Sequence, residues 1–77
     1  MPMWMRRDEI AAALDMSGDE LRWYEDQFRE QVRLLTMADE AGSLLYSADA
    51  LRLLRGVSAM CAQGATPEQI KGWFGLA

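Results

Sequence analysis

Residues 17–20, which read Ser-Gly-Asp-Glu, constrain the fold more than any other segment because they form a capping box. In this motif the serine hydroxyl accepts a hydrogen bond from the glutamate N–H, and the glutamate side chain reaches back to the serine N–H. Met16 before the cap and Leu21 at the fourth helical position add a hydrophobic staple. An apolar stripe continues at helical spacing through Leu21, Tyr24, Phe28 and Val32. The pattern predicts one helix that begins after Ser17 and ends between residues 31 and 35.

A shorter helix is expected immediately before this one, over residues 7–14. Its apolar residues share one side at helical spacing: Ile10, Ala11, Ala13 and Leu14. Asp8 and Glu9 suit its first turn because acidic side chains complement the positive end of the helix dipole. Only residues 15 and 16 separate the two helices. Two short helices joined by a tight turn are typical of a helix-turn-helix motif.

The next segment favours a small β-hairpin over residues 34–46. Two short apolar segments flank a turn-forming stretch that ends in glycine. The segments are Leu-Leu-Thr-Met at 34–37 and Ser-Leu-Leu-Tyr at 43–46, and the turn is Ala-Asp-Glu-Ala-Gly at 38–42. A helix that runs through Ala38 is the competing interpretation. A hairpin that follows the second helix of a helix-turn-helix is a wing.

Two more helices are expected after the hairpin, over about residues 48–63 and 67–74. Ser47 or Asp49 can cap the first, and Gly64 is a natural stop for it. Residues 66–69, Thr-Pro-Glu-Gln, form a second capping box with proline at the first helical position. The apolar side of the last helix consists of Ile70, Trp73 and Phe74. The expected fold is therefore a mainly α winged helix-turn-helix domain over residues 1–77, with about four short helices and a hairpin wing.

Composition excludes several classes of protein. No apolar run approaches the roughly 20 residues that a membrane span needs, and residues 1–7 lack the order of charges of a signal peptide. One cysteine and no histidine exclude a structural zinc site and fit a reducing compartment. We therefore expect a cytoplasmic protein that needs no metal and no cofactor.

The sequence contains no pattern of residues that is typical of an active site. It has no histidine to act as a base and no glycine-rich phosphate loop. The acidic pairs are neighbours in sequence, so their side chains diverge rather than converge in a cleft. We expect no catalytic residues and a protein that is not an enzyme.

Three segments in order resemble the DNA-binding domain of the MerR family of winged-helix regulators. They are Ile-Ala-Ala-Ala-Leu-Asp-Met-Ser-Gly-Asp-Glu-Leu-Arg-Trp-Tyr-Glu at 10–25, Leu-Tyr-Ser-Ala-Asp-Ala-Leu at 45–51 and Gln-Gly-Ala-Thr-Pro-Glu-Gln-Ile at 63–70. The resemblance implies a transcriptional regulator that binds double-stranded DNA, with the recognition helix in the major groove and the wing on the backbone. Full regulators of the family continue into a long dimerising helix and an effector domain. The resemblance therefore implies an excised domain or a small stand-alone relative of the excisionase type, and a dimer only where such a helix follows.

The candidate DNA contacts are basic and aromatic side chains. Arg22, in the Leu-Arg-Trp-Tyr-Glu segment of the second helix, can bridge phosphate or grip guanine, or it is simply paired with Asp26. Tyr24 can donate its hydroxyl to a phosphate or belong to the core. Trp23 is expected to pack against the wing. Backbone contacts are expected from Arg6, Arg7, Arg29 and Arg33, unless these are ordinary surface charges.

Three features favour a different partner. The net charge is −4, Leu44 occupies the wing position where the family usually carries arginine, and Asp19 and Glu20 stand at the start of the recognition helix. Acidic side chains there repel phosphate, although Glu20 can accept from cytosine N4. The alternative function is a winged helix that binds protein, through an exposed apolar patch formed by Leu44, Leu53 and Met60.

Overall fold

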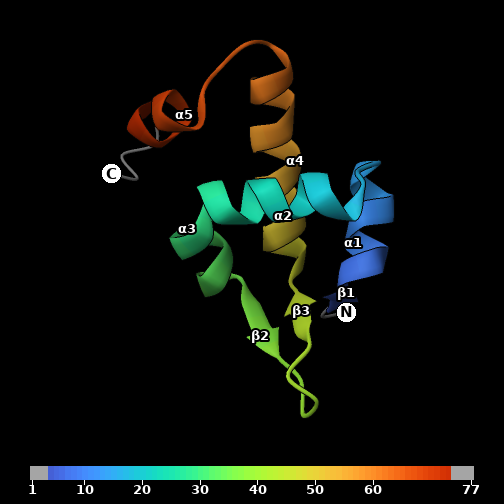
Figure 1. Cartoon of the computed structure of the whole chain (residues 1–77). Helices are drawn as coiled ribbons and strands as arrows, with labels where there is room; N and C mark the ends of the chain where they lie inside the picture. Colours follow the sequence, from blue (N-terminus) through green and yellow to red (C-terminus); the bar gives the residue numbers. More distant parts are fainter. Residues whose placement is uncertain (1–3, 74–77) are drawn as a thin grey trace.

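The computed structural model describes residues 4–73, and within them the elements follow the order of a winged helix-turn-helix domain (Figure 1). The elements are β1 (Met5–Arg6), α1 (Arg7–Leu14), α2 (Gly18–Gln27), α3 (Arg29–Leu34), β2 (Thr36–Ala38), β3 (Leu44–Tyr46), α4 (Ala48–Ala62) and α5 (Pro67–Trp73). The predicted fold class is confirmed: the described part is mostly helical and carries one small antiparallel sheet. Phe74, which was expected in the last helix, lies outside the described residues.

The helices begin where local capping predicts. Ser17 Oγ accepts from Glu20 N at 3.1 Å, and Ser17 N donates to Glu20 Oε1 at 3.4 Å. Ser47, rather than Asp49, caps α4: its Oγ accepts from Ala50 N at 3.1 Å and donates to the carbonyl of Leu35 at 2.7 Å. The box of Thr66 and Gln69 opens α5 with reciprocal bonds of 3.1 and 2.9 Å. These bonds satisfy N–H groups that helix starts otherwise leave unpaired.

The expected single second helix is in fact two helices, which is a correction to the sequence prediction. Phe28, at φ −120° and ψ 39°, separates α2 from α3 and is fully buried. Its N–H still donates to the Tyr24 carbonyl at 3.0 Å, and its own carbonyl accepts from Val32 N at 2.9 Å. The break turns α3 away from the line of α2 (Figure 1), so Val32 is buried in the same core as Leu21.

The wing is a three-stranded sheet in the order β1-β3-β2. The hairpin of β2 and β3 pairs Met37 with Leu45, so the competing helix through Ala38 does not form. The strand β1 was not foreseen: Met5 pairs with Tyr46, and Arg6 pairs with Leu45. At the tip of the hairpin, Asp39 Oδ1 accepts from the N–H groups of Ala41 and Ser43, each at 2.9 Å.

One hydrophobic core joins these elements. Its buried residues are Ile10, Leu21, Phe28, Val32, Tyr46, Ala50, Leu54, Val57 and Ile70. Each of the helices α1, α4 and α5 places at least one residue in it, and β3 contributes Tyr46. Among the described residues, none of the helices has the length and apolar character required to cross a membrane.

The turn at Gly42 gives a stability prediction with a matched control. Gly42 has φ +84°, a region that alanine adopts at a cost of about 1–2 kcal/mol, so Gly42→Ala should lower the free energy of unfolding by that amount. Gly56 lies inside α4 with open space at its Cβ position, so Gly56→Ala should raise it by about 0.5–1 kcal/mol. Urea unfolding followed by circular dichroism measures both. Equal effects of the two substitutions would contradict the left-handed turn.

Candidate nucleic-acid interface

The outward face of α2 is exposed, and α2 crosses the front of the molecule in Figure 1. Leu21 and Phe28 hold the opposite face of the helix in the core. The side chains left outside are those of Asp19, Glu20, Arg22, Trp23 and Asp26. The exposed part of α2 therefore carries one cation, three carboxylates and an indole.

Arg22 is exposed, and among residues 4–73 it takes part in none of the ion pairs or hydrogen bonds. The pairing with Asp26, considered from the spacing in the sequence, does not occur. Asp26 instead lies 3.6 Å from Arg29, which stands three residues further along at the start of α3. The Arg22 guanidinium is thus free to contact a ligand.

The two aromatic residues of α2 pack together. The rings of Trp23 and Tyr24 meet edge to face, with centroids 4.9 Å apart and an interplanar angle of 87°. Tyr24 is half-buried against the core, while Trp23 is more exposed. Burial, followed by the nearby Cys61 and Glu20, raises the pKa of the Tyr24 hydroxyl, so this group remains a hydrogen-bond donor.

Arg7 belongs to a network that joins α1, α2 and β3. Its Nη1 lies 2.8 Å from Glu25 Oε1 and donates to the Tyr46 hydroxyl at 2.9 Å. The Tyr46 hydroxyl in turn donates to Glu25 Oε2. Arg7 Nη2 is buried and has no hydrogen-bond partner among the described residues. One end of the side chain that was a candidate phosphate contact therefore points into the protein.

Electrostatics keep Tyr46 neutral and Arg7 charged within this network. Burial raises the pKa of Tyr46, and the adjacent Glu25 carboxylate raises it further because a phenolate beside it is repelled. Burial alone would lower the pKa of Arg7, but the hydrogen bond to Glu25 and its charge raise it overall. The tyrosine thus stays a neutral donor and the arginine a cation across the ordinary pH range. Together they hold the wing against α2.

Arginines border the wing on both sides of Leu44. A groove of about 340 Å³ is lined by Arg6, Arg7, Asp8, Ser43 and Leu44. A second groove of about 200 Å³ is lined by Glu25, Asp26, Arg29, Val32, Arg33, Thr36 and Leu44. Arg6 also lies 3.7 Å from Asp39, but most of its side chain is exposed. The structure therefore brings Arg29 and Arg33 to one side of the wing and Arg6 to the other, an arrangement that sequence spacing did not reveal.

The apolar surface lies elsewhere than the sequence suggested. Leu53 and Met60, expected to be exposed, are partly buried against the core. Leu44 is exposed, but the wing and the C-terminal end of α4 lie at opposite ends of the molecule (Figure 1), so the three residues form no single patch. The large hydrophobic side chains that are exposed are Trp4, Trp23, Leu34, Met37, Leu44 and Trp73. Apolar periodicity does not predict the exposure of most of these side chains, because they lie at a helix end or on a strand.

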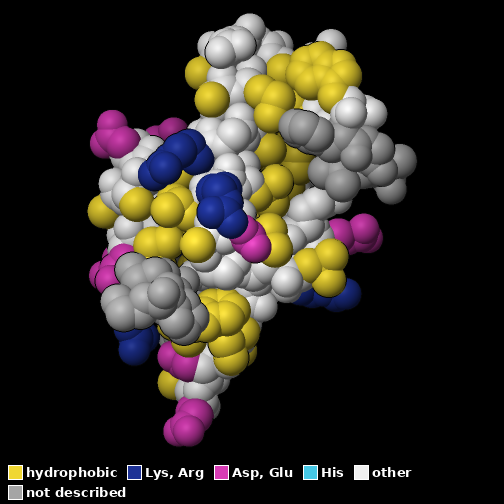
Figure 2. All heavy atoms as spheres, turned by 180° about the vertical axis from the view of Figure 1, so that it is seen from behind, with side chains coloured by type: hydrophobic (Ala, Val, Ile, Leu, Met, Phe, Trp, Pro, Cys, Tyr) yellow, Lys and Arg dark blue, Asp and Glu magenta, His cyan; other side chains and the backbone are white. Residues whose placement is uncertain are grey.

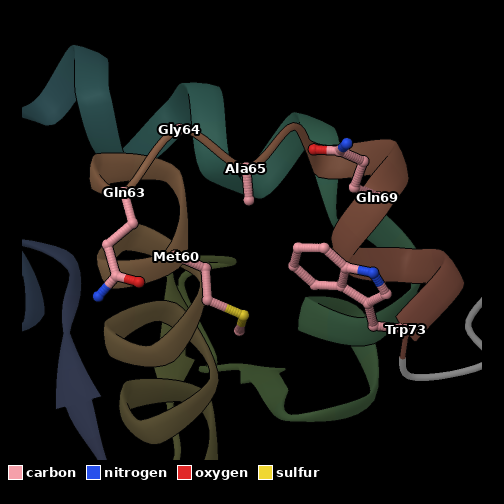
Figure 3. A pocket seen from close by; sticks show the side chains of 6 residues that line it. All are labelled: Met60, Gln63, Gly64, Ala65, Gln69 and Trp73. Carbon is pink, nitrogen blue, oxygen red and sulfur yellow. The ribbon is translucent and has the colours of Figure 1, made fainter.

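A cavity of about 290 Å³ lies between α4 and α5 (Figure 3). Trp73 and Met60 point towards it from the two helices, and Gln63, Gly64, Ala65 and Gln69 complete its lining. Figure 2 shows that hydrophobic side chains gather on this side of the molecule, where α4 and α5 lie. Among the described residues that line the cavity, none has an ionisable side chain. Among residues 4–73, no group of three acidic or cysteine side chains lies close enough to hold a metal ion.

Comparison with known proteins agrees with this geometry. A family model described as MerR HTH family regulatory protein matches residues 5–75, nearly the whole chain. No curated protein and no solved structure gives a significant match.

Proposed function

The chain belongs to the MerR family of helix-turn-helix regulatory proteins, and from this premise we propose that α2 enters the major groove of double-stranded DNA while the wing lies against flanking phosphates. The observation that carries the proposal is the state of Arg22. Its guanidinium is exposed on the outward face of α2, and Asp26, the counter-ion expected from the sequence, is paired with Arg29 instead. A free arginine on a recognition helix can grip guanine O6 and N7 or bridge a phosphate.

The wing contributes through its neighbours rather than through its own tip. Leu44 has no charge, so the cations that meet the backbone are Arg6 on one side and Arg29 and Arg33 on the other. Arg7 has an indirect role, because its bonds to Glu25 and Tyr46 set the position of α1 and the wing relative to α2. Tyr24 adds a neutral hydroxyl donor beside Trp23. Phosphate contacts of this kind position a protein on the duplex, and base contacts specify the site.

A binding experiment tests the role of Arg22. Duplexes selected from a random-sequence library at about 50 mM salt, where phosphate contacts are strong, are titrated with wild type, Arg22→Ala and Arg55→Ala. Loss of one bidentate contact corresponds to roughly 5- to 150-fold weaker binding, so Arg22→Ala should lose that much. Arg55→Ala removes the same charge from an exposed position on α4 and should change the affinity far less.

Two outcomes would count against the proposal. Wild type that binds no duplex at this salt concentration does not act on DNA. Equal losses in the two variants would mean that α2 has no special part in binding. The second candidate function, a module that binds protein, would then gain weight from the exposed side chains of Met37 and Leu44 on the wing.

A further inference from the structure

We infer that Asp19 selects a cytosine in the major groove, beside the base pair that Arg22 reads. This inference rests on the proposed function and assigns a role to a residue that otherwise only opposes it. Asp19 lies in the first turn of α2 and is exposed. The N-terminal residues of a recognition helix are the ones that approach base edges.

Asp19 is distinguished from the other acidic residues of α2 by its lack of partners. Glu20 is held by the capping box, where its Oε1 accepts from Ser17 N. Glu25 is held by Arg7 and Tyr46, and Asp26 lies against Arg29. Among residues 4–73, the Asp19 carboxylate has no hydrogen bond and no ion pair. A carboxylate in this state is available to accept from a ligand.

The geometry places Asp19 and Arg22 over neighbouring bases. Residues three apart on a helix have Cβ atoms about 5–6 Å apart on one face. Successive bases along a strand rise by about 3.4 Å. The two side chains can therefore contact adjacent or next-but-one base pairs in one groove, and the backbone of α2 does not have to change.

The chemistry of a carboxylate leaves one favourable base. Ionised aspartate only accepts hydrogen bonds, and in the major groove guanine and thymine present acceptors at the reading edge. Adenine offers its N6 donor next to the N7 acceptor, whereas cytosine offers the N4 donor alone. Cytosine is thus the base from whose N4 group Asp19 accepts a hydrogen bond, and Arg22 contacts a guanine nearby. Because Asp19 also repels phosphate, it weakens binding to unrelated DNA and so adds specificity rather than affinity.

Base preferences measured on randomised duplexes test the inference. Wild type should enrich cytosine at one position near a guanine, with roughly 5- to 150-fold weaker binding when that cytosine is changed. Asp19→Asn should shift the preference to adenine, because asparagine pairs with adenine N6 and N7. Asp19→Ala should lose the preference there, keep the guanine and bind unrelated DNA more tightly. Glu68→Gln is the matched control: it removes one charge from an exposed first-turn position of α5 and should leave the base preferences unchanged.

The possible failures can be told apart. If wild type binds duplexes but Asp19→Asn and Asp19→Ala keep its base preferences, the inference about Asp19 is overturned and the proposed function stands. If wild type binds no duplex at low salt, the inference about Asp19 and the proposed function are both overturned. Far-ultraviolet circular dichroism confirms that each variant is folded before its preferences are compared.

Discussion

Replacing Phe28 with alanine should lower the free energy of unfolding by about 3–5 kcal/mol, the usual cost of truncating a buried aromatic side chain. Phe28 is fully buried, and it is the residue at which α2 ends and α3 begins. The Lys71 ammonium of α5 lies 5.4 Å from its ring centroid, so one side chain connects three helices. A chain of 77 residues has a small core and modest stability, and such a loss should leave much of the protein unfolded.

Urea unfolding of the variant, followed by circular dichroism, measures this loss. Leu34→Ala is the matched control, because it truncates a large apolar side chain of the adjoining helix that is 81% exposed. Its effect should stay within about 0.5 kcal/mol. A loss below about 1 kcal/mol for Phe28→Ala, or equal losses for the two variants, would show that the ring does not anchor the junction.

Replacing Glu25 with alanine should cost about 2–3 kcal/mol of stability. The substitution removes the acceptor of both Arg7 Nη1 and the Tyr46 hydroxyl, and Arg7 Nη2 already lacks a partner among residues 4–73. Breaking a fully buried ion pair from one side costs about 3–5 kcal/mol. Here the Arg7 side chain is 36% exposed, so water recovers part of the loss. The variant should also loosen the wing relative to α2 and weaken any DNA binding.

Asp26→Ala is the control for Glu25→Ala, since it removes the neighbouring carboxylate of the same helix. Asp26 is 60% exposed and pairs with Arg29 at the surface, where such pairs contribute about 0–1 kcal/mol. A double-mutant cycle of Glu25→Ala with Tyr46→Phe then isolates the energy of their contact. Equal effects of Glu25→Ala and Asp26→Ala, or purely additive effects in the cycle, would contradict a network that couples the three elements.

The starts of α2, α4 and α5 could be predicted because each depends on bonds between residues three apart. Ser17, Ser47 and Thr66 each cap a helix through a side chain and an N–H group in the same turn. The hairpin was predicted for a similar reason, since its turn residues Asp39 and Gly42 act locally. Interactions of this range leave a direct trace in the order of residue types.

The break at Phe28 and the strand β1 could not be predicted in this way. The apolar spacing continues through the break, because Leu21, Phe28 and Val32 serve one core whether the helix is straight or bent. Residues 5 and 6 form a strand only because Tyr46 and Leu45, about 40 positions along the chain, lie beside them. A pairing at that separation has no signature in a two-residue segment.

The same division applies to the candidate interface. Helical spacing by itself determined that Arg22 stands outside the apolar stripe of α2, on the face that a ligand can reach. Only the tertiary structure decided which charges are free. It paired Arg7 with Glu25 and Tyr46, 18 and 39 positions away, and Asp26 with Arg29 across the helix break, while Arg22 and Asp19 were left without partners among residues 4–73. The physical reason is that an ion pair forms between side chains that packing brings together, and packing is a property of the whole core.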